Sequence, residues 1–148
     1  VDYPEDEEEM DIVRMVTSGS FEDIESAVSG EDILRYQALI RKAPVADHVL
    51  RYAVNLVRAT RREKPEATDF VKKWMSFGAG PRASLSLISA AKARAILAGN
   101  YHVSTEDVAA VAIPVLRHRI APNFAAMAEG INSVKIIEHL LETIPQNS

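Results

Sequence analysis

The sequence predicts an all-α fold, a small bundle of about five to six helices. Apolar residues recur at the three- and four-residue spacing of an amphipathic helix along most of the chain, most clearly at Val49, Tyr52, Ala53 and Leu56. The alternation typical of a half-buried strand is almost absent. Of the 148 residues, 47% are hydrophobic and 26% are charged, so the chain is large enough to bury a core. These observations favour one globular helical domain over residues 1–148.

Proline, glycine and capping residues indicate where the helices begin and end. Pro4 and the acids that follow it suit a first helical turn, and Ser18-Gly19 suits a helix end. Residues 21–28 fit either a short helix or a loop. The expected helices run from Pro4 to about Ser18, from Ser29-Gly30 to before Pro44, from after Pro44 to before Thr60, from about Pro81 to Ala98, from Ser104 to about Arg117 and from Ser133 to before Pro145.

Some of these helices also carry packing and capping predictions. The helix that begins at Pro81 is rich in alanine, which lets neighbouring helices approach closely, so we expect it to be the central helix. Ser104, with Asp107 three positions later, and Ser133 are expected to be N-caps. In the helix after Ser29-Gly30, the residues expected to face inward are Ile33, Tyr36, Leu39 and Ile40.

The most informative pattern is the segment Gly78-Ala79-Gly80-Pro81-Arg82. Pro81 suits the first position of a helix, and the two glycines allow a sharp turn before it. Arg82 then lies in the first turn, where free backbone N–H groups and the positive end of the helix dipole attract an anion such as phosphate. Ser86 and Ser89 share the face of Arg82. On local grounds alone an arginine in a first helical turn is more often a solvated surface charge.

Three longer stretches extend this pattern over nearly the whole chain. They are Trp74-Met75-Ser76-Phe77-Gly78-Ala79-Gly80-Pro81-Arg82-Ala83-Ser84, the segment from Asp107 to Ile120 that ends in Val115-Leu116-Arg117-His118-Arg119-Ile120, and the opening Tyr3-Pro4 with its acids. Together they resemble the C-terminal lid domain of MoxR-type AAA+ ATPases. The resemblance implies that residues 1–148 are a single helical lid domain, excised from a longer chain whose N-terminal α/β core binds the nucleotide.

The resemblance also implies a function and a site. Arg82 matches the sensor 2 arginine, which reaches from the lid to the γ-phosphate of ATP, whereas Gly80 stands where many relatives have serine. The lid would close over ATP and couple its hydrolysis to the remodelling or assembly of partner proteins, a chaperone-like role in enzyme maturation. ATP and Mg²⁺ would be the cofactors of the parent protein, with none expected on this domain alone.

The partners implied by the resemblance are mostly parts of the same assembly. They are the domain's own AAA+ core, the neighbouring subunits of a ring expected to be a hexamer, and a von Willebrand factor A domain protein. A cytoplasmic location is expected. No apolar run approaches the roughly 18 residues of a membrane span, so a membrane is not expected as a partner. A net charge of −4 and a pI near 5.6 make nucleic acid an unexpected partner as well.

The sequence contains no complete catalytic motif. Gly-x-x-x-x-Gly-Lys-Ser/Thr, Gly-x-Gly-x-x-Gly and His-Glu-x-x-His are all missing. We therefore predict no catalytic residue, and an ATPase activity that belongs to the parent protein. His139 and Glu142 share a helix face, but two ligands at this spacing do not predict a metal site. The absence of cysteine excludes disulfide bonds.

An alternative function rests on a basic region from Arg58 to Lys73, which contains Arg61, Arg62, Lys64 and Lys72. Under this alternative the chain is an independent helical module that binds a protein or a nucleic acid through these cations. Cations near a helix C-terminus are also explained by the helix dipole. The cluster Arg117-His118-Arg119 has two interpretations, a contact to a neighbouring subunit or a set of charges that satisfies helix carbonyls.

Overall fold

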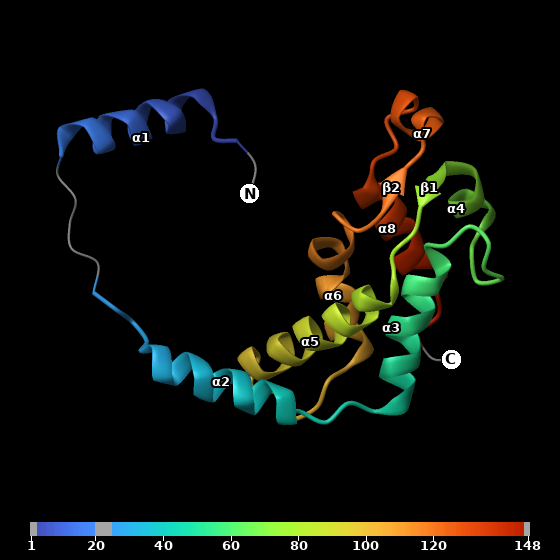
Figure 1. Ribbon diagram of the computed structural model, residues 1–148, viewed down its shortest axis with the longest axis horizontal. Helices are drawn as coiled ribbons and strands as arrows, with labels where there is room; N and C mark the ends of the chain where they lie inside the picture. The colour runs from blue at the N-terminus through green and yellow to red at the C-terminus, as the bar shows by residue number, and fades with distance from the viewer. Residues whose placement is uncertain (1–2, 20–24, 147–148) are drawn as a thin grey trace. The chain divides into compact units, whose positions relative to one another are not determined.

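Figure 1 shows a computed structural model of the chain, which describes residues 3–19 and 25–146. The chain divides into two units, Val1–Ile33 and Leu34–Ser148. Eight helices and two short strands occur among the described residues. The all-α prediction is therefore confirmed. The helix count exceeds the expected five to six, in part because the short helices α4 (Asp69–Trp74) and α7 (Phe124–Ala128) hold too few turns to display a periodic pattern.

The first unit contains helix α1 (Asp6–Ser18), which begins two residues after Pro4. Its N-cap is Glu5, whose backbone N–H donates to Glu8 Oε2 at 3.1 Å in a capping box. Four acids in the first turn complement the helix dipole. The helix ends at Gly19, whose φ of 68° is the left-handed conformation that glycine adopts without strain. No residue of α1 is buried.

Helix α2 (Gly30–Lys42) begins where Ser29-Gly30 predicted. Ser29 Oγ accepts from the Asp32 backbone N–H, and Asp32 Oδ2 accepts from the Ser29 backbone N–H, both at 3.1 Å. Residues 25–28 form no helix, and the rest of the ambiguous 21–28 segment lies outside the described residues.

One packing prediction for α2 is wrong. Its apolar residues were expected to face inward, but α2 has no buried residue, because an apolar spacing marks one face of a helix and does not determine how closely a neighbour packs on it. Ile40 is half-buried, and the others are exposed by about half, namely Ile33 at 47%, Tyr36 at 54% and Leu39 at 50%.

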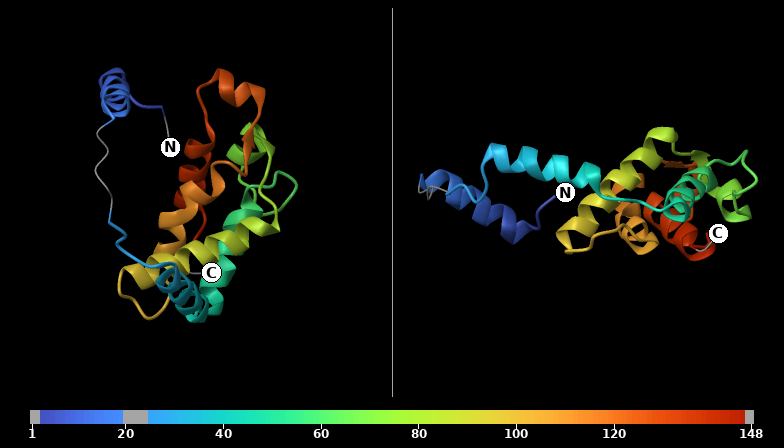
Figure 2. Two further views of the ribbon diagram at one scale, coloured as in Figure 1. Left: turned by 60° about the vertical axis from the view of Figure 1, so that its left-hand side comes forward. Right: turned by 90° about the horizontal axis from the view of Figure 1, so that it is seen from below.

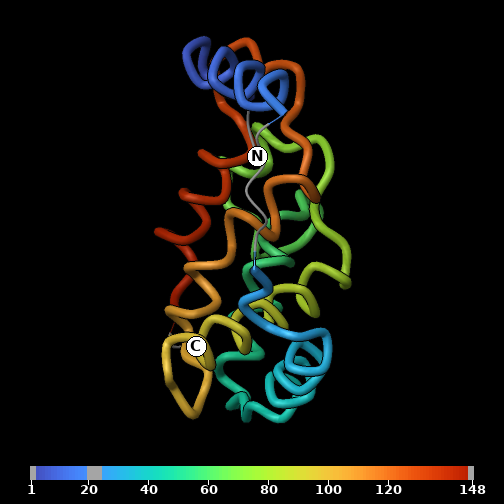
Figure 3. Tube along the Cα trace, turned by 90° about the vertical axis from the view of Figure 1, so that its left-hand side faces the viewer, coloured from blue at the N-terminus to red at the C-terminus, as the bar shows by residue number. Residues whose placement is uncertain are grey.

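The second unit has its core among four helices, α3 (Asp47–Ala59), α5 (Pro81–Leu97), α6 (Thr105–Leu116) and α8 (Ser133–Thr143). Helix α3 contacts the other three, and α5 lies against both α3 and α6 (Figure 2). Figure 3 shows α8, in red, beside α6. The buried residues of α5 recur every four positions at Ala83, Leu87, Ala91 and Ala95, so the small side chains allow the close packing that the sequence predicted.

A small two-stranded sheet lies between the helices of this unit. Strand β1 (Met75–Phe77) pairs antiparallel with β2 (Ala121–Pro122), with Met75 opposite Pro122. These strands are too short to show alternation in the sequence. The sheet ties the chain just before the Gly78 loop to the segment that follows α6.

The capping predictions have different outcomes at the two last long helices. Ser104 is the N-cap of α6 as predicted, and its Oγ accepts from the Asp107 backbone N–H at 3.2 Å. Helix α8 is capped by Asn132 rather than Ser133, since Asn132 Oδ1 accepts from the Lys135 N–H at 3.0 Å. Asparagine caps a helix as well as serine does, so the residue one position earlier takes the role.

Asp107 links the start of α6 to α5. Its carboxylate is 2% exposed, accepts from the Ser104 backbone N–H at 3.0 Å, and forms an ion pair with Arg94. Burial raises the pKa of this carboxyl, but the hydrogen bonds from Ser104 and Arg94 together lower it below its usual value. The charged form is therefore the one that the fold stabilises.

Candidate functional site

The site is built around the first turn of α5. Gly80 is the N-cap, Pro81 occupies the first helical position and Arg82 the second. No side chain caps this helix. Pro81 has no backbone N–H and the Ala83 N–H donates to the Gly80 carbonyl at 3.0 Å, so among the described residues the Arg82 N–H is the first-turn donor without a partner. The helix therefore presents a free N-terminus with an arginine beside it, as the sequence predicted.

Arg82 is exposed, and no hydrogen bond or ion pair to its guanidinium is found within the described part of the chain. Three other arginines of the chain differ from it in this respect. Arg94 pairs with Asp107, Arg58 with Glu66, and Arg61 bonds to a backbone carbonyl. An exposed cation without a partner at a helix N-terminus can take an anion without first breaking a contact.

The loop before α5 is bound to the C-terminal end of α3. Thr60 Oγ1 accepts from the Ala79 backbone N–H at 2.9 Å, and Arg61 Nε donates to the Ala79 carbonyl at 2.8 Å. Thr60 Oγ1 also donates to the Val57 carbonyl at 2.6 Å. Thr60 and Ala79 are both buried. The two backbone polar groups of Ala79 are thus satisfied by two consecutive residues of another segment.

Gly78 is required by the close approach of the two segments. A Cβ at this position would lie 2.4 Å from the Thr60 carbonyl oxygen, closer than any real contact of that kind. At Gly80, by contrast, nothing lies within 4 Å of such a Cβ, and its φ is −80°. Both glycines were expected to allow the turn, but only Gly78 is required there. The reason is that a side chain at Gly78 would clash with Thr60, and not that its φ is left-handed.

The two glycines are expected to respond oppositely to serine. Gly80→Ser adds an N-cap hydroxyl without a clash and should stabilise the fold by about 0.3 kcal/mol, since glycine is only slightly worse than serine at an N-cap. Gly78→Ser forces the loop away from α3 and should destabilise it by about 2 kcal/mol, a typical cost of overpacking. Urea unfolding of the two variants followed by circular dichroism measures the difference. Equal shifts at both positions would contradict this account of the loop.

An arginine from the segment after α6 contacts the polar face of α5, a contact that the sequence did not predict. Ser86 follows Arg82 by one turn, and Arg119 Nη2 lies 3.4 Å from Ser86 Oγ. Arg119 also donates to the Val115 carbonyl and contacts His118 Nε2 at 2.6 Å. The bond to Val115 favours the interpretation that this cluster satisfies carbonyls at the end of α6. The contact with Ser86 depends on the packing of α6 on α5, which no local pattern reveals.

The basic region from Arg58 to Lys73 is largely engaged in local contacts. Arg58 Nε lies 2.5 Å from Glu66 Oε1, a contact whose hydrogen bond lowers the pKa of the Glu66 carboxyl. Lys72 Nζ lies 3.4 Å from Asp69 Oδ1, and Lys73 Nζ lies 4.3 Å from the centre of the Trp74 ring. These contacts leave fewer cations for an external partner than the sequence suggested, so no observation favours the alternative binding function.

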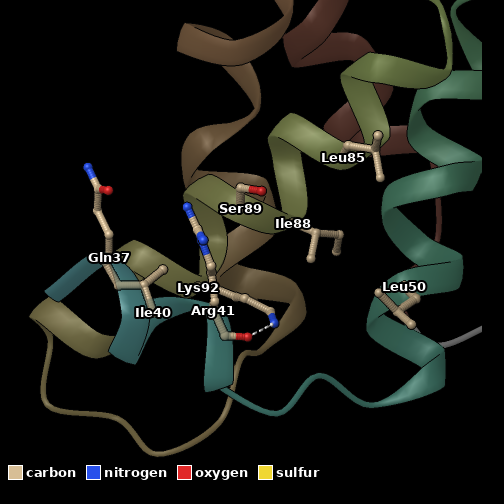
Figure 4. Close-up of a pocket in the computed structure, with 8 residues that line it drawn as sticks. All are labelled: Gln37, Ile40, Arg41, Leu50, Leu85, Ile88, Ser89 and Lys92. Carbon is tan, nitrogen blue, oxygen red and sulfur yellow. Dashed lines mark hydrogen bonds between the residues drawn. The ribbon is translucent and has the colours of Figure 1, made fainter. Parts of the chain in front are cut away.

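Two pockets border α5 in the second unit. One, of about 280 Å³, lies between the end of α3 and the Gly78 loop and is lined by Arg61, Arg62, Glu63, Ser76, Phe77, Gly78, Ala79 and Gly80. The other, of about 400 Å³, is mostly apolar and is shown in Figure 4. Its lining includes Lys92, whose Nζ donates to the Arg41 carbonyl at 3.0 Å. Only the first pocket adjoins the N-terminus of α5.

No cluster of three or more histidine, cysteine or acidic side chains that could hold a metal ion occurs in residues 3–19 and 25–146. His139 instead stacks on Phe70, with ring centres 4.4 Å apart, and its Nε2 lies 3.2 Å from Thr68 Oγ1. Within the same residues, each helix is too short or too polar to span a membrane.

Comparison with known proteins gives consistent results. The family model of the AAA lid domain matches residues 68–140, which include α4 to α7 and most of α8. The chain is 38% identical over 146 residues to the chaperone MoxR1 of Mycobacterium tuberculosis (strain H37Rv), covering 97% of this chain and 38% of that protein. It is 27% identical over 143 residues to the uncharacterized protein YeaC of Bacillus subtilis (strain 168), covering 96% of this chain and 42% of that protein.

A solved structure agrees with these sequence relatives. The crystal structure of a "putative ATPase" from Cytophaga hutchinsonii superposes with a TM-score of 0.82 at 32% identity, covering 98% of this chain and 44% of the other. The chain therefore spans less than half the length of each protein that it matches here. On the family match, the relatives and the shared fold, we identify the chain as a helical AAA lid domain of the MoxR family of AAA+ ATPases.

Proposed function

We propose that this domain closes over ATP bound by a AAA+ core and that Arg82 is the sensor 2 residue that contacts the γ-phosphate. The observation that carries the proposal is the exposed guanidinium of Arg82 at the uncapped N-terminus of α5. The charge of Arg82, the helix dipole and the backbone N–H of Arg82, which is unpaired within the described residues, all favour an anion at that position. None of the catalytic motifs of an ATPase is present in this chain, so the proposal assigns hydrolysis to the core.

The physical basis is the change in phosphate charge during the reaction. Mg²⁺ bound with ATP in the core would neutralise part of the phosphate charge, and Arg82 adds a planar donor from the lid side. The contact of Arg82 strengthens as charge develops on the transferring phosphoryl group. Once the phosphate leaves, Arg82 loses its anion and the closed lid is no longer stabilised. The angle of the lid therefore follows the state of the nucleotide.

The biological task that we propose is the remodelling or assembly of partner proteins by a ring of such subunits in the cytoplasm. The chaperone name of the Mycobacterium relative supports it. In this proposal the lid packs on its own core and contributes to a hexameric ring, and a von Willebrand factor A domain protein acts as a partner. The domain binds no ATP or Mg²⁺ when it is separated from the core.

A fluorescent label near the start of α5 tests the proposal in the full-length protein. This chain has no cysteine, so Ser76→Cys, with any cysteines outside the chain replaced, gives one labelled position on the pocket beside Gly80. We expect the emission of an environment-sensitive dye there to change when ATP binds and to return after hydrolysis. The matched control is Asn100→Cys, just beyond the far end of α5, about 25 Å away at 1.5 Å per residue. No response at Ser76→Cys, or equal responses at both positions, would contradict the proposal.

A further inference from the structure

The loop that presents Arg82 is attached to α3 through one residue, Ala79. Its N–H and its carbonyl are bound by Thr60 Oγ1 at 2.9 Å and by Arg61 Nε at 2.8 Å. Ala79 is 1% exposed and Thr60 0% exposed, so water does not compete for the bond between them. The Thr60 hydroxyl is itself held in one orientation, because it donates a hydrogen bond to the Val57 carbonyl of α3.

Little freedom remains between this attachment and Arg82. Only Gly80 and Pro81 separate Ala79 from Arg82, and the ring of Pro81 fixes its φ. Gly78 lies against the Thr60 carbonyl on the other side, so the loop cannot move closer to α3. The end of α3 therefore restrains the point at which α5 starts and, with it, the backbone of Arg82.

Helix α3 contacts α5, α6 and α8 in the second unit. A force on Arg82 would thus pass through Ala79 to a helix that packs on three others, rather than being absorbed by a flexible loop.

We propose that Thr60 and Arg61 are positioning residues that hold Arg82 in the geometry needed to sense the nucleotide. This inference rests on the proposed function of Arg82. Neither residue needs to touch the nucleotide, since each acts through the Ala79 backbone. A misplacement of about 1 Å is enough to lower the rate of an enzyme by up to about 100-fold, so a loosened loop has a measurable consequence.

The test measures kcat and KM for ATP with the full-length protein. Thr60→Val keeps the shape of the side chain but removes the hydroxyl that accepts from Ala79, and we expect kcat to fall by about tenfold. Thr60→Ser restores the hydroxyl and should return kcat to within about twofold of the original. Arg61→Met removes the second bond at a half-buried position, which provides an independent variant if Thr60→Val does not fold.

A double-mutant cycle separates positioning from a general loss of stability. If Thr60 acts through Arg82, then Thr60→Val lowers kcat when Arg82 is present and has no further effect in the Arg82→Ala background. The matched control is Thr68→Val, which removes the N-cap hydroxyl of α4 that accepts from the Val71 N–H at 3.2 Å, away from the Gly78 loop. We expect this control to leave kcat unchanged in both backgrounds.

The outcomes separate the positioning role of Thr60 and Arg61 from the proposed function of Arg82, on which that role rests. A loss of kcat with Arg82→Ala but none with Thr60→Val or Arg61→Met would overturn the inference and leave the role of Arg82 intact. The same would follow if Thr60→Val lowered kcat by an equal factor in both backgrounds, or if Thr60→Ser failed to restore it. No loss with Arg82→Ala itself would overturn both.

Discussion

Replacing Arg82 by alanine in the full-length protein is expected to lower steady-state ATP turnover by about 100-fold or more. The reason is that this guanidinium is proposed to bind charge that develops in the transition state, and removal of one such donor typically costs a factor of about 100 to 1000. Binding of ATP should change much less, because the core holds most of the nucleotide. Turnover and equilibrium nucleotide binding, measured on the same preparation, separate the two effects.

Two further variants sharpen this experiment. Arg82→Lys keeps the charge but lacks the planar pair of donors, so an intermediate loss of about tenfold is expected. Arg51→Ala removes another exposed arginine, on α3, and should leave turnover unchanged. If turnover with Arg82→Ala equals that of the original protein, Arg82 is a surface charge at a helix start. The proposed role in nucleotide sensing would then be wrong.

Replacing Leu56 by alanine is expected to lower the free energy of unfolding by about 4 kcal/mol, within the range measured for buried leucines. Leu56 is 0% exposed and belongs to α3, the helix that contacts α5, α6 and α8. Truncation removes apolar contacts with several elements and leaves a cavity that a close-packed helical core cannot fill. Urea unfolding of the 148-residue chain, followed by circular dichroism, measures the loss.

Leu97→Ala is the matched control for this prediction. Leu97 is the last residue of α5 and is 86% exposed, so the same chemical change should alter stability by no more than about 0.5 kcal/mol. A similar loss at both positions would mean that the core is not organised around α3. A loss below about 1 kcal/mol at Leu56 would show that the cavity closes by rearrangement.

The helices of this protein are mostly determined by local sequence. The Ser104 cap with Asp107, the Pro81 start and the positive φ of Gly99, just after the end of α5, are short-range effects that each residue type imposes on its neighbours. The apolar spacing in α3 likewise indicated which face would be buried, and the alanines of α5 indicated that neighbouring helices would pack closely on it. The position of Arg82 in the first turn of α5 was predicted for the same reason.

Tertiary structure alone decided how that first turn is held and which faces stay open. The bonds from Thr60 and Arg61 to Ala79 join residues 19 and 18 positions apart, and the contact of Arg119 with Ser86 joins residues 33 positions apart. No periodic pattern encodes such pairs, because they depend on how whole helices pack. The same reason explains the exposed face of α2, where periodicity indicates an apolar surface but only packing decides whether a neighbour covers it.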